Sequence, residues 1–157
     1  MDLFINAVLV ASSAVLFCYW FRYCCLLILA AESSHDYTAE IAEANQLAFP
    51  EVRARLRQHD ATALAYLHQS LERDFAVLTR LLEQTHKAIF DPCFEEVMLT
   101  IHFRTMSASF HLTRRRFPTS AADALEEMTR VVTHLANQLG EHQTTANPHL
   151  RGITVWK

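Results

Sequence analysis

The chain has 157 residues and a formal net charge of −3, enough material for one domain and a little more. This mild acidity does not favour a nucleic-acid partner, because phosphate-binding domains normally carry a surplus of basic residues. Only two glycines and four prolines occur, too few for the many tight turns of an all-β fold. The composition therefore predicts an all-α fold made of a few long helices.

The first predicted element is the apolar stretch from Leu3 to Ala31, in which Arg22 carries the single charge. A helix of this length would measure about 43 Å, whereas the hydrocarbon core of a bilayer is roughly 30 Å thick. Arg22 would then lie near one interface, with Trp20 in an aromatic belt beside it. We predict a single-pass membrane anchor, with residues 1–35 forming the transmembrane helix and a juxtamembrane segment.

Two other interpretations of this stretch are a cleavable signal peptide and a soluble core helix. Residues 30–33, with the sequence AAES, would suit cleavage. No basic segment precedes the apolar run, however, and the run is about twice the usual length of a signal-peptide core. A core helix would need other segments to surround it on every side, and the sequence offers none.

Polar and small side chains inside the predicted span indicate a helix-packing face. Asn6, Ser12 and Ser13 are such residues, and membrane helices often meet where side chains are small or seek a polar partner. Serine hydroxyls also bond to preceding carbonyls of their own helix. Both interpretations of the two serines stay open at this point.

The distribution of positive charge predicts the orientation of the anchor. No Lys or Arg precedes the apolar stretch, whereas Arg22, Arg53, Arg55 and Arg57 follow on the other side. Because basic flanks remain in the cytoplasm, we expect the carboxy-terminal domain to be cytoplasmic. Three of the four cysteines lie within the anchor, so no disulfide within that domain is expected.

The helical bundle domain is predicted to span residues 36–140. The polar segment 32–48 is helix-compatible and is expected to continue the anchor helix outward. Pro50 suits the first turn of a short helix, and Asp60 suits the N-cap of a helix over 61–90. Apolar residues recur there every three or four positions: Leu64, Leu67, Leu71, Phe75, Leu78, Leu82 and Ile89.

Two further helices are predicted toward the carboxy terminus. One begins at Asp91 and Pro92 and runs to about Arg115. The other covers 121–139, after a capping box formed by Ser120 and Asp123, and ends at Gly140. The first helix is expected to bury Phe94, Met98, Ile101, Ala108 and Leu112. The second presents a seam of Leu125, Met128, Val132, Leu135 and Leu139.

Each of these stripes needs a partner surface, which predicts an antiparallel bundle of three to four helices. We expect six residues at the centres of their stripes to share its core: Leu71, Leu78, Ile101, Leu125, Val132 and Leu135. Residues 141–157 form a C-terminal tail. Trp156 in this tail is a poor choice for a solvated terminus, so docking on the bundle or on a partner is an alternative to disorder.

The one dense basic cluster is formed by Arg114, Arg115 and Arg116. It falls at the predicted end of a helix, where cations interact favourably with the helix dipole. The other interpretation is contact with anionic lipid head groups or with an acidic partner.

The sequence contains no motif that predicts catalysis. A Gly-rich phosphate loop, CxxC, HExxH and GxSxG are all missing from it. No cofactor, no metal site and no enzymatic activity are therefore expected. Two Glu-x-x-His pairs, Glu32 with His35 and Glu83 with His86, resemble half of a di-iron site. Metal or haem binding, with His102, His111 or His134 as haem ligands, is kept as a minor alternative.

The function predicted from these features is that of a membrane-anchored accessory or scaffolding subunit of a multi-subunit complex. The expected partners are other membrane protein subunits, the lipid bilayer and a second copy of the chain, with no nucleic acid. A membrane-tethered sensor or signalling adaptor is the alternative. The residues predicted to contact membrane or partner are Asn6, Ser12, Ser13, Trp20, Arg22, Arg114, Arg115, Arg116 and Trp156.

Overall fold

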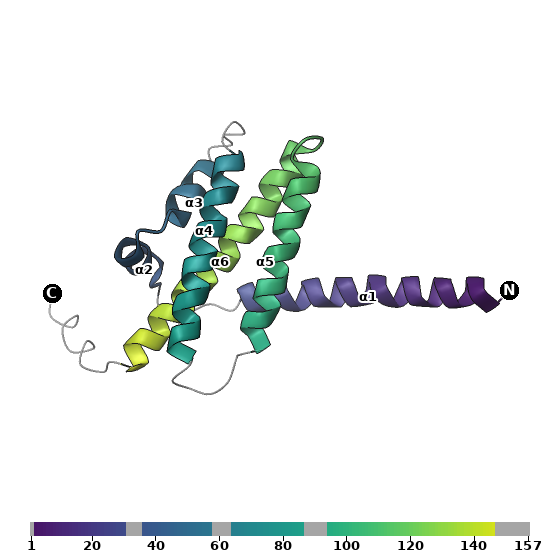
Figure 1. The fold of residues 1–157 in the computed structure, drawn as a ribbon, viewed down its shortest axis with the longest axis horizontal. Helices are drawn as coiled ribbons and strands as arrows, with labels where there is room; N and C mark the ends of the chain where they lie inside the picture. Colours follow the sequence, from purple (N-terminus) through teal and green to yellow (C-terminus); the bar gives the residue numbers. More distant parts are fainter. Residues whose placement is uncertain (1, 31–35, 58–63, 87–93, 147–157) are drawn as a thin grey trace. The chain divides into compact units, whose positions relative to one another are not determined.

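The computed structural model describes residues 2–30, 36–57, 64–86 and 94–146, and these are helical with short connections (Figure 1). The helices are α1 (Asp2–Ala30), α2 (Thr38–Asn45), α3 (Phe49–Arg57), α4 (Leu64–His86), α5 (Phe94–Thr113) and α6 (Pro118–Ala146). No strand occurs in the described part of the chain, which confirms the all-α prediction. The chain divides into two units, Met1–Glu32 and Ser33–Lys157.

The first unit is the single helix α1. Its residues Phe4–Ala30 are long and apolar enough to cross a membrane, a property shared by some signal sequences and by core helices of soluble proteins. The apolar side chains are distributed around the whole helix rather than along one stripe. Helices of this kind are surrounded by an apolar environment on every side.

The predicted continuous helix over 32–48 is wrong, because it is interrupted at residues 36 and 37. Asp36 and Tyr37 are non-helical, and α2 ends at Asn45, followed by the C-cap residue Gln46, whose φ of 53° is left-handed. Leu47 N–H donates to the carbonyl of Ala42 at 2.9 Å, a bond that closes the last turn of α2. Pro50 lies in the first turn of α3, as predicted.

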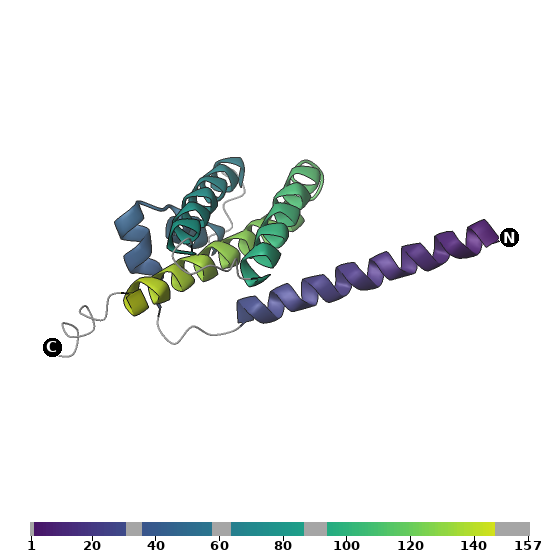
Figure 2. The same cartoon turned by 60° about the horizontal axis from the view of Figure 1, so that its bottom comes forward.

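Helix α6 is the central element of the second unit. It contacts α2, α3, α4 and α5, and both views show it running past these helices (Figures 1 and 2). The predicted seam is confirmed, since all five of its residues are buried: Leu125, Met128, Val132, Leu135 and Leu139. The α4 stripe is confirmed for Leu67, Leu71, Phe75, Leu78 and Leu82, which are buried, whereas Leu64 is only half-buried. Asp60, Ile89, Asp91 and Pro92 lie outside the described residues.

The buried face of α5 differs from the prediction. Only Met98 of the expected set is buried, whereas Phe94, Ile101, Ala108 and Leu112 are exposed. The buried residues of α5 are Met98, Leu99, His102, Phe103, Met106, Ser107 and Phe110. The prediction failed because this face includes a histidine and a serine, while the outer face is also apolar. Ile101 is therefore removed from the predicted common core.

Two pairs of stacked rings show the direction of α5 relative to α4. Phe75 stacks on Phe103 with ring centroids 3.9 Å apart, and His68 stacks on Phe110 at 4.4 Å. The later residue on α4 therefore pairs with the earlier one on α5, so α4 and α5 run in opposite directions. The rings in each helix are seven residues apart, which returns them to the same side after two turns.

Two histidine–glutamate pairs join α5 to α6. His102 Nε2 lies 3.2 Å from Glu127 Oε2, and His134 Nε2 lies 3.3 Å from Glu95 Oε1. The two paired residues of α5 are seven residues apart, and so are the two of α6. The earlier residue on α5 pairs with the later one on α6, so these helices also run in opposite directions. The α5–α6 interface thus combines the apolar seam with polar pairs at two levels.

The ends of α6 also differ from the prediction. The helix begins at Pro118, so Ser120 lies inside its first turn rather than at the N-cap. It continues through Gly140 to Ala146, so Gly140 is an interior residue and does not end it. The reason for a glycine here is the close approach of Tyr37, which occupies the space that a Cβ would need.

Candidate functional site

The predicted contact residues of the first unit all lie on α1. Asn6, Ser13 and Trp20 are each seven residues apart and so share one side of the helix. Ser12 Oγ donates to the carbonyl of Leu9 at 3.0 Å, which satisfies its hydroxyl within its own helix. Arg22 is exposed on the same helix.

The predicted basic cluster follows the carboxy end of α5. Arg114, Arg115 and Arg116 are exposed, and they form the turn that leads into α6. Arg114 N–H still donates to the carbonyl of Phe110 at 2.9 Å, so this cluster lies where the helix dipole favours cations. Trp156 lies outside the described residues.

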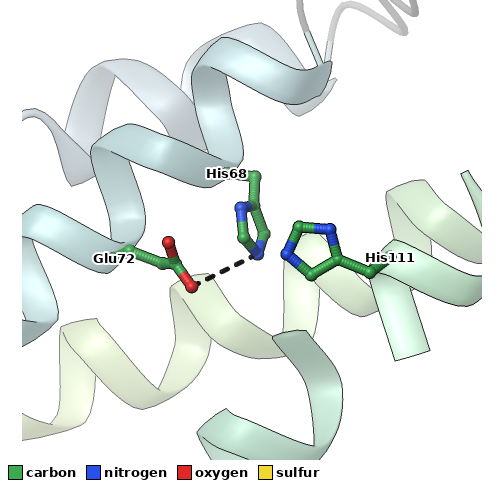
Figure 3. Close-up of side chains that lie close together, drawn as sticks. All are labelled: His68, Glu72 and His111. Carbon is green, nitrogen blue, oxygen red and sulfur yellow. Dashed lines mark ion pairs between the residues drawn. The ribbon is translucent and has the colours of Figure 1, made fainter. Parts of the chain in front are cut away.

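A cluster of titratable side chains joins α4 to α5 near this turn. His68 and Glu72 are one turn apart on α4, and His111 approaches them from α5 (Figure 3). Each residue offers one ligand atom, and these atoms all lie within 4.8 Å of one another. His68 is buried, Glu72 is half-buried and His111 is exposed, so the cluster reaches from the core to the surface.

The imidazole of His68 is held by its neighbours. It stacks on the Phe110 ring within 7° of parallel, and the His111 ring meets it edge-on at a centroid distance of 4.8 Å. His68 Nε2 lies 2.9 Å from Ser107 Oγ, and that hydroxyl donates to Glu72 Oε1 at 3.1 Å. Because the one serine proton is used toward Glu72, His68 Nε2–H is the donor to Ser107.

Burial lowers the pKa of His68 below its ordinary value of 6.5, and the neighbouring His111 and Arg114 lower it further. The Glu72 carboxylate raises this pKa in opposition. The net effect keeps the imidazole neutral near neutral pH. A neutral imidazole with a carboxylate and a second imidazole can bind a transition metal or pass a proton through Ser107.

The sequence alone did not predict this cluster. His111 was a candidate only as a haem ligand, and His68 and Glu72 were not candidates for any site. The spacing of His68 and Glu72, four residues apart in an amphipathic helix, was the available signal because such residues share a helix face. The approach of His111 depends on how α5 packs and could not be found from spacing.

The other histidine candidates lie elsewhere. His102 and His134 are at the α5–α6 interface beside Glu127 and Glu95. Glu83 is exposed on α4. Its Glu-x-x-His pair, and that of Glu32 with His35, rest on residues or side chains outside the described part.

A second feature of α5 is its exposed apolar side. Phe94, Val97, Ile101, Ala108 and Leu112 are all exposed, and we call these five residues the α5 outer row. Phe94 and Leu112 retain 75% and 80% of their accessible surface. The spacing of the row, in steps of three, four and seven, keeps it on one side of the helix, where the exposed Thr105 lies between Ile101 and Ala108. This row lies opposite the face that packs on α6.

Comparisons with models of protein families, with curated proteins and with solved structures found no match for this chain. Function must therefore be inferred from the chain's own residues. The relevant features are the apolar surfaces of α1 and α5 and the His68–Glu72–His111 cluster.

Proposed function

We propose that this chain is a membrane-anchored accessory or scaffolding subunit of a multi-subunit membrane complex. In this proposal α1 is a retained single-pass anchor, and the domain that follows is a cytoplasmic antiparallel bundle of three to four helices. The domain acts by binding protein partners rather than by catalysis. Lipid and other membrane subunits surround α1.

The observation that carries the proposal is the α5 outer row. Isolated apolar side chains on a surface are ordinary, whereas several of them on one side of a helix mark an interaction surface. Its helical spacing and its length suit an apolar partner helix that lies along α5. We therefore assign to this row an apolar helix of another subunit.

The apolar circumference of α1 supports the same proposal. A helix whose side chains are apolar on every side is stable inside a bilayer or among other membrane helices. Asn6 and Ser13 lie on one side of this helix, and there they would face a neighbouring helix rather than lipid. Arg22 and Trp20 would lie at the interface with the head groups.

Affinity purification of the full chain in mild detergent tests this function. We expect stoichiometric partners to co-purify with the wild type and to be lost from Val97→Asp and Ile101→Asp. Gln143→Asp, an exposed substitution on α6, is the matched control and should retain them. Recovery of monomeric wild-type protein alone would contradict the proposal. Exchange of the purified chain between two oligomeric states would instead support the sensor alternative.

Topology requires its own measurement. A reporter fused after Lys157 that is active only in the cytoplasm should be active, and the intact mass should include residues 1–35. A reporter that works only outside the cytoplasm would reverse the orientation. A mass lacking the apolar stretch would show that it is a signal peptide.

A further inference from the structure

We propose that His68, Glu72 and His111 form a binding site for one divalent transition-metal ion of the zinc type. This inference is independent of the accessory function, because no residue of the α5 outer row belongs to the cluster. The sequence alone predicted no metal site. The tertiary structure changes that expectation by adding His111 to the pair on α4 (Figure 3).

The donor set is the first argument. Two imidazoles and one carboxylate suit zinc and its neighbours in the first transition series, whereas calcium and magnesium prefer sites built of oxygen alone. Three protein ligands leave one coordination position open to water. No reaction is assigned to that position.

The distances are the second argument. Zinc–nitrogen bonds of about 2.0–2.1 Å in a tetrahedral site place two ligand atoms roughly 3.4 Å apart. His68 Nε2 and Glu72 Oε1 are 3.8 Å apart, and all three donors lie within 4.8 Å. A ring nitrogen of His111 is turned toward His68 Nε2 in Figure 3. Closing the site therefore needs movements of about an ångström, shared among side chains.

The freedom of the three ligand side chains to move also favours a metal site. The stack on Phe110 and the surrounding core hold the His68 ring in place. Glu72 and His111 are partly or fully exposed, so their rotamers can change at little cost. One fixed ligand and two adjustable ligands allow the site to close around an ion without moving a helix.

Ser107 supplies a supporting contact. Its hydroxyl donates to Glu72 Oε1, and such outer contacts orient metal ligands. Binding requires the lone pair of His68 Nε2, which in the metal-free state carries the proton donated to Ser107. That proton moves to Nδ1 of the same ring, so the imidazole stays neutral and no net proton is lost. His111 binds through the deprotonated nitrogen of its neutral imidazole.

The test uses the full chain in detergent, purified without a histidine tag and with its thiols alkylated so that cysteines do not bind the probe. Equilibrium dialysis against Zn²⁺ with elemental analysis measures stoichiometry and affinity. The cluster variants are His68→Gln, Glu72→Gln and His111→Gln. The matched controls are Glu83→Gln, an exposed carboxylate on the same helix, and His142→Gln on α6. Circular dichroism verifies that each variant is folded.

We expect one tightly bound Zn²⁺ per wild-type chain. Each cluster variant should weaken this binding by at least roughly tenfold, since even outer-contact changes cost about 10–100-fold in metal affinity. Both controls should bind as the wild type does. Co²⁺ in place of Zn²⁺ should give visible absorption bands that the cluster variants lose.

Equal Zn²⁺ affinity in wild type, Glu72→Gln and His111→Gln would overturn the proposal, as would a wild type that binds no ion. These two substitutions are at partly or fully exposed positions, so the test stands even where His68→Gln prevents folding. Loss of binding in the controls as well would place the ion at other residues and would also reject this site.

Discussion

Tyr37 packs against Gly140 so closely that the glycine has no room for a side chain. A Cβ built on Gly140 would clash with Cβ of Tyr37 and come within 2.6 Å of its Cγ. Tyr37 N–H donates to Asn137 Oδ1 at 3.0 Å. The start of α2 is thereby attached to α6 across 100 residues of sequence.

Gly140→Ala should therefore destabilise the protein although alanine is the better helix former. The propensity gain is about 1 kcal/mol, whereas forcing a methyl group into a packed contact costs about 1–3 kcal/mol. Chemical unfolding of the full chain in detergent, followed by circular dichroism, measures the net loss. In a Tyr37→Gly background, which removes the Tyr37 Cβ as well as its ring, the same substitution should become stabilising by about 1 kcal/mol. A destabilising effect in both backgrounds would show that Tyr37 is not the obstacle.

Asp74→Ala should destabilise α3. Asp74 is buried on α4, and its Oδ2 accepts the N–H of Ala48 at 2.8 Å, with Phe49 N–H as a second donor. Removing the acceptor leaves these N–H groups, of which that of Ala48 is partly buried, without this partner, at a cost of about 1–3 kcal/mol. Asp74→Asn keeps an acceptor and should lose less, since Asn and Asp are comparable helix caps. Equal losses in the two variants would contradict this assignment.

The same carboxyl group should make stability depend on pH. Burial raises the pKa of Asp74 above its ordinary value of 3.8, although the N–H groups of Phe49 and Ala48 and the charge of Arg73 lower it. The folded state then holds the proton more tightly than the unfolded state. The resulting stabilisation is complete below the unfolded pKa and is lost as pH rises through the folded pKa.

Comparison with Asp74→Asn isolates this effect. The unfolding free energy of the wild type minus that of the variant should fall as pH is raised from about 3.5 to about 7. Thermal or chemical unfolding across this range measures the difference. A difference that rises with pH would mean that the hydrogen bonds outweigh burial and lower the pKa.

The two faces of α5 should respond differently to truncation. Phe103 is 1% exposed and stacks on Phe75, so Phe103→Ala should cost about 3–5 kcal/mol. Ile101 is 48% exposed, and Ile101→Ala should change stability by about 0.5 kcal/mol or less, as surface substitutions do. The two positions are only two residues apart, yet the expected losses in unfolding free energy differ several-fold. Similar losses for both would place Ile101 in a core.

Much of the fold could be predicted because helices leave a periodic signal. The α6 seam from Leu125 to Leu139 was correct, since residues spaced three and four apart must share one side of a helix. The α4 stripe was correct for the same reason. The prediction for α5 failed because two of its sides are apolar and spacing alone does not say which one meets α6.

The sequence by itself determined the helical content, the apolar circumference of α1 and the buried stripes of α4 and α6. These follow from local composition and from the 3.6-residue period. Only the tertiary structure decided that α5 buries His102 and Ser107 while Ile101 stays outside. It also decided that Gly140 makes room for Tyr37, and that His111 joins His68 and Glu72. Each of these depends on which distant residues meet, because burial and close packing are properties of two surfaces in contact and not of one segment.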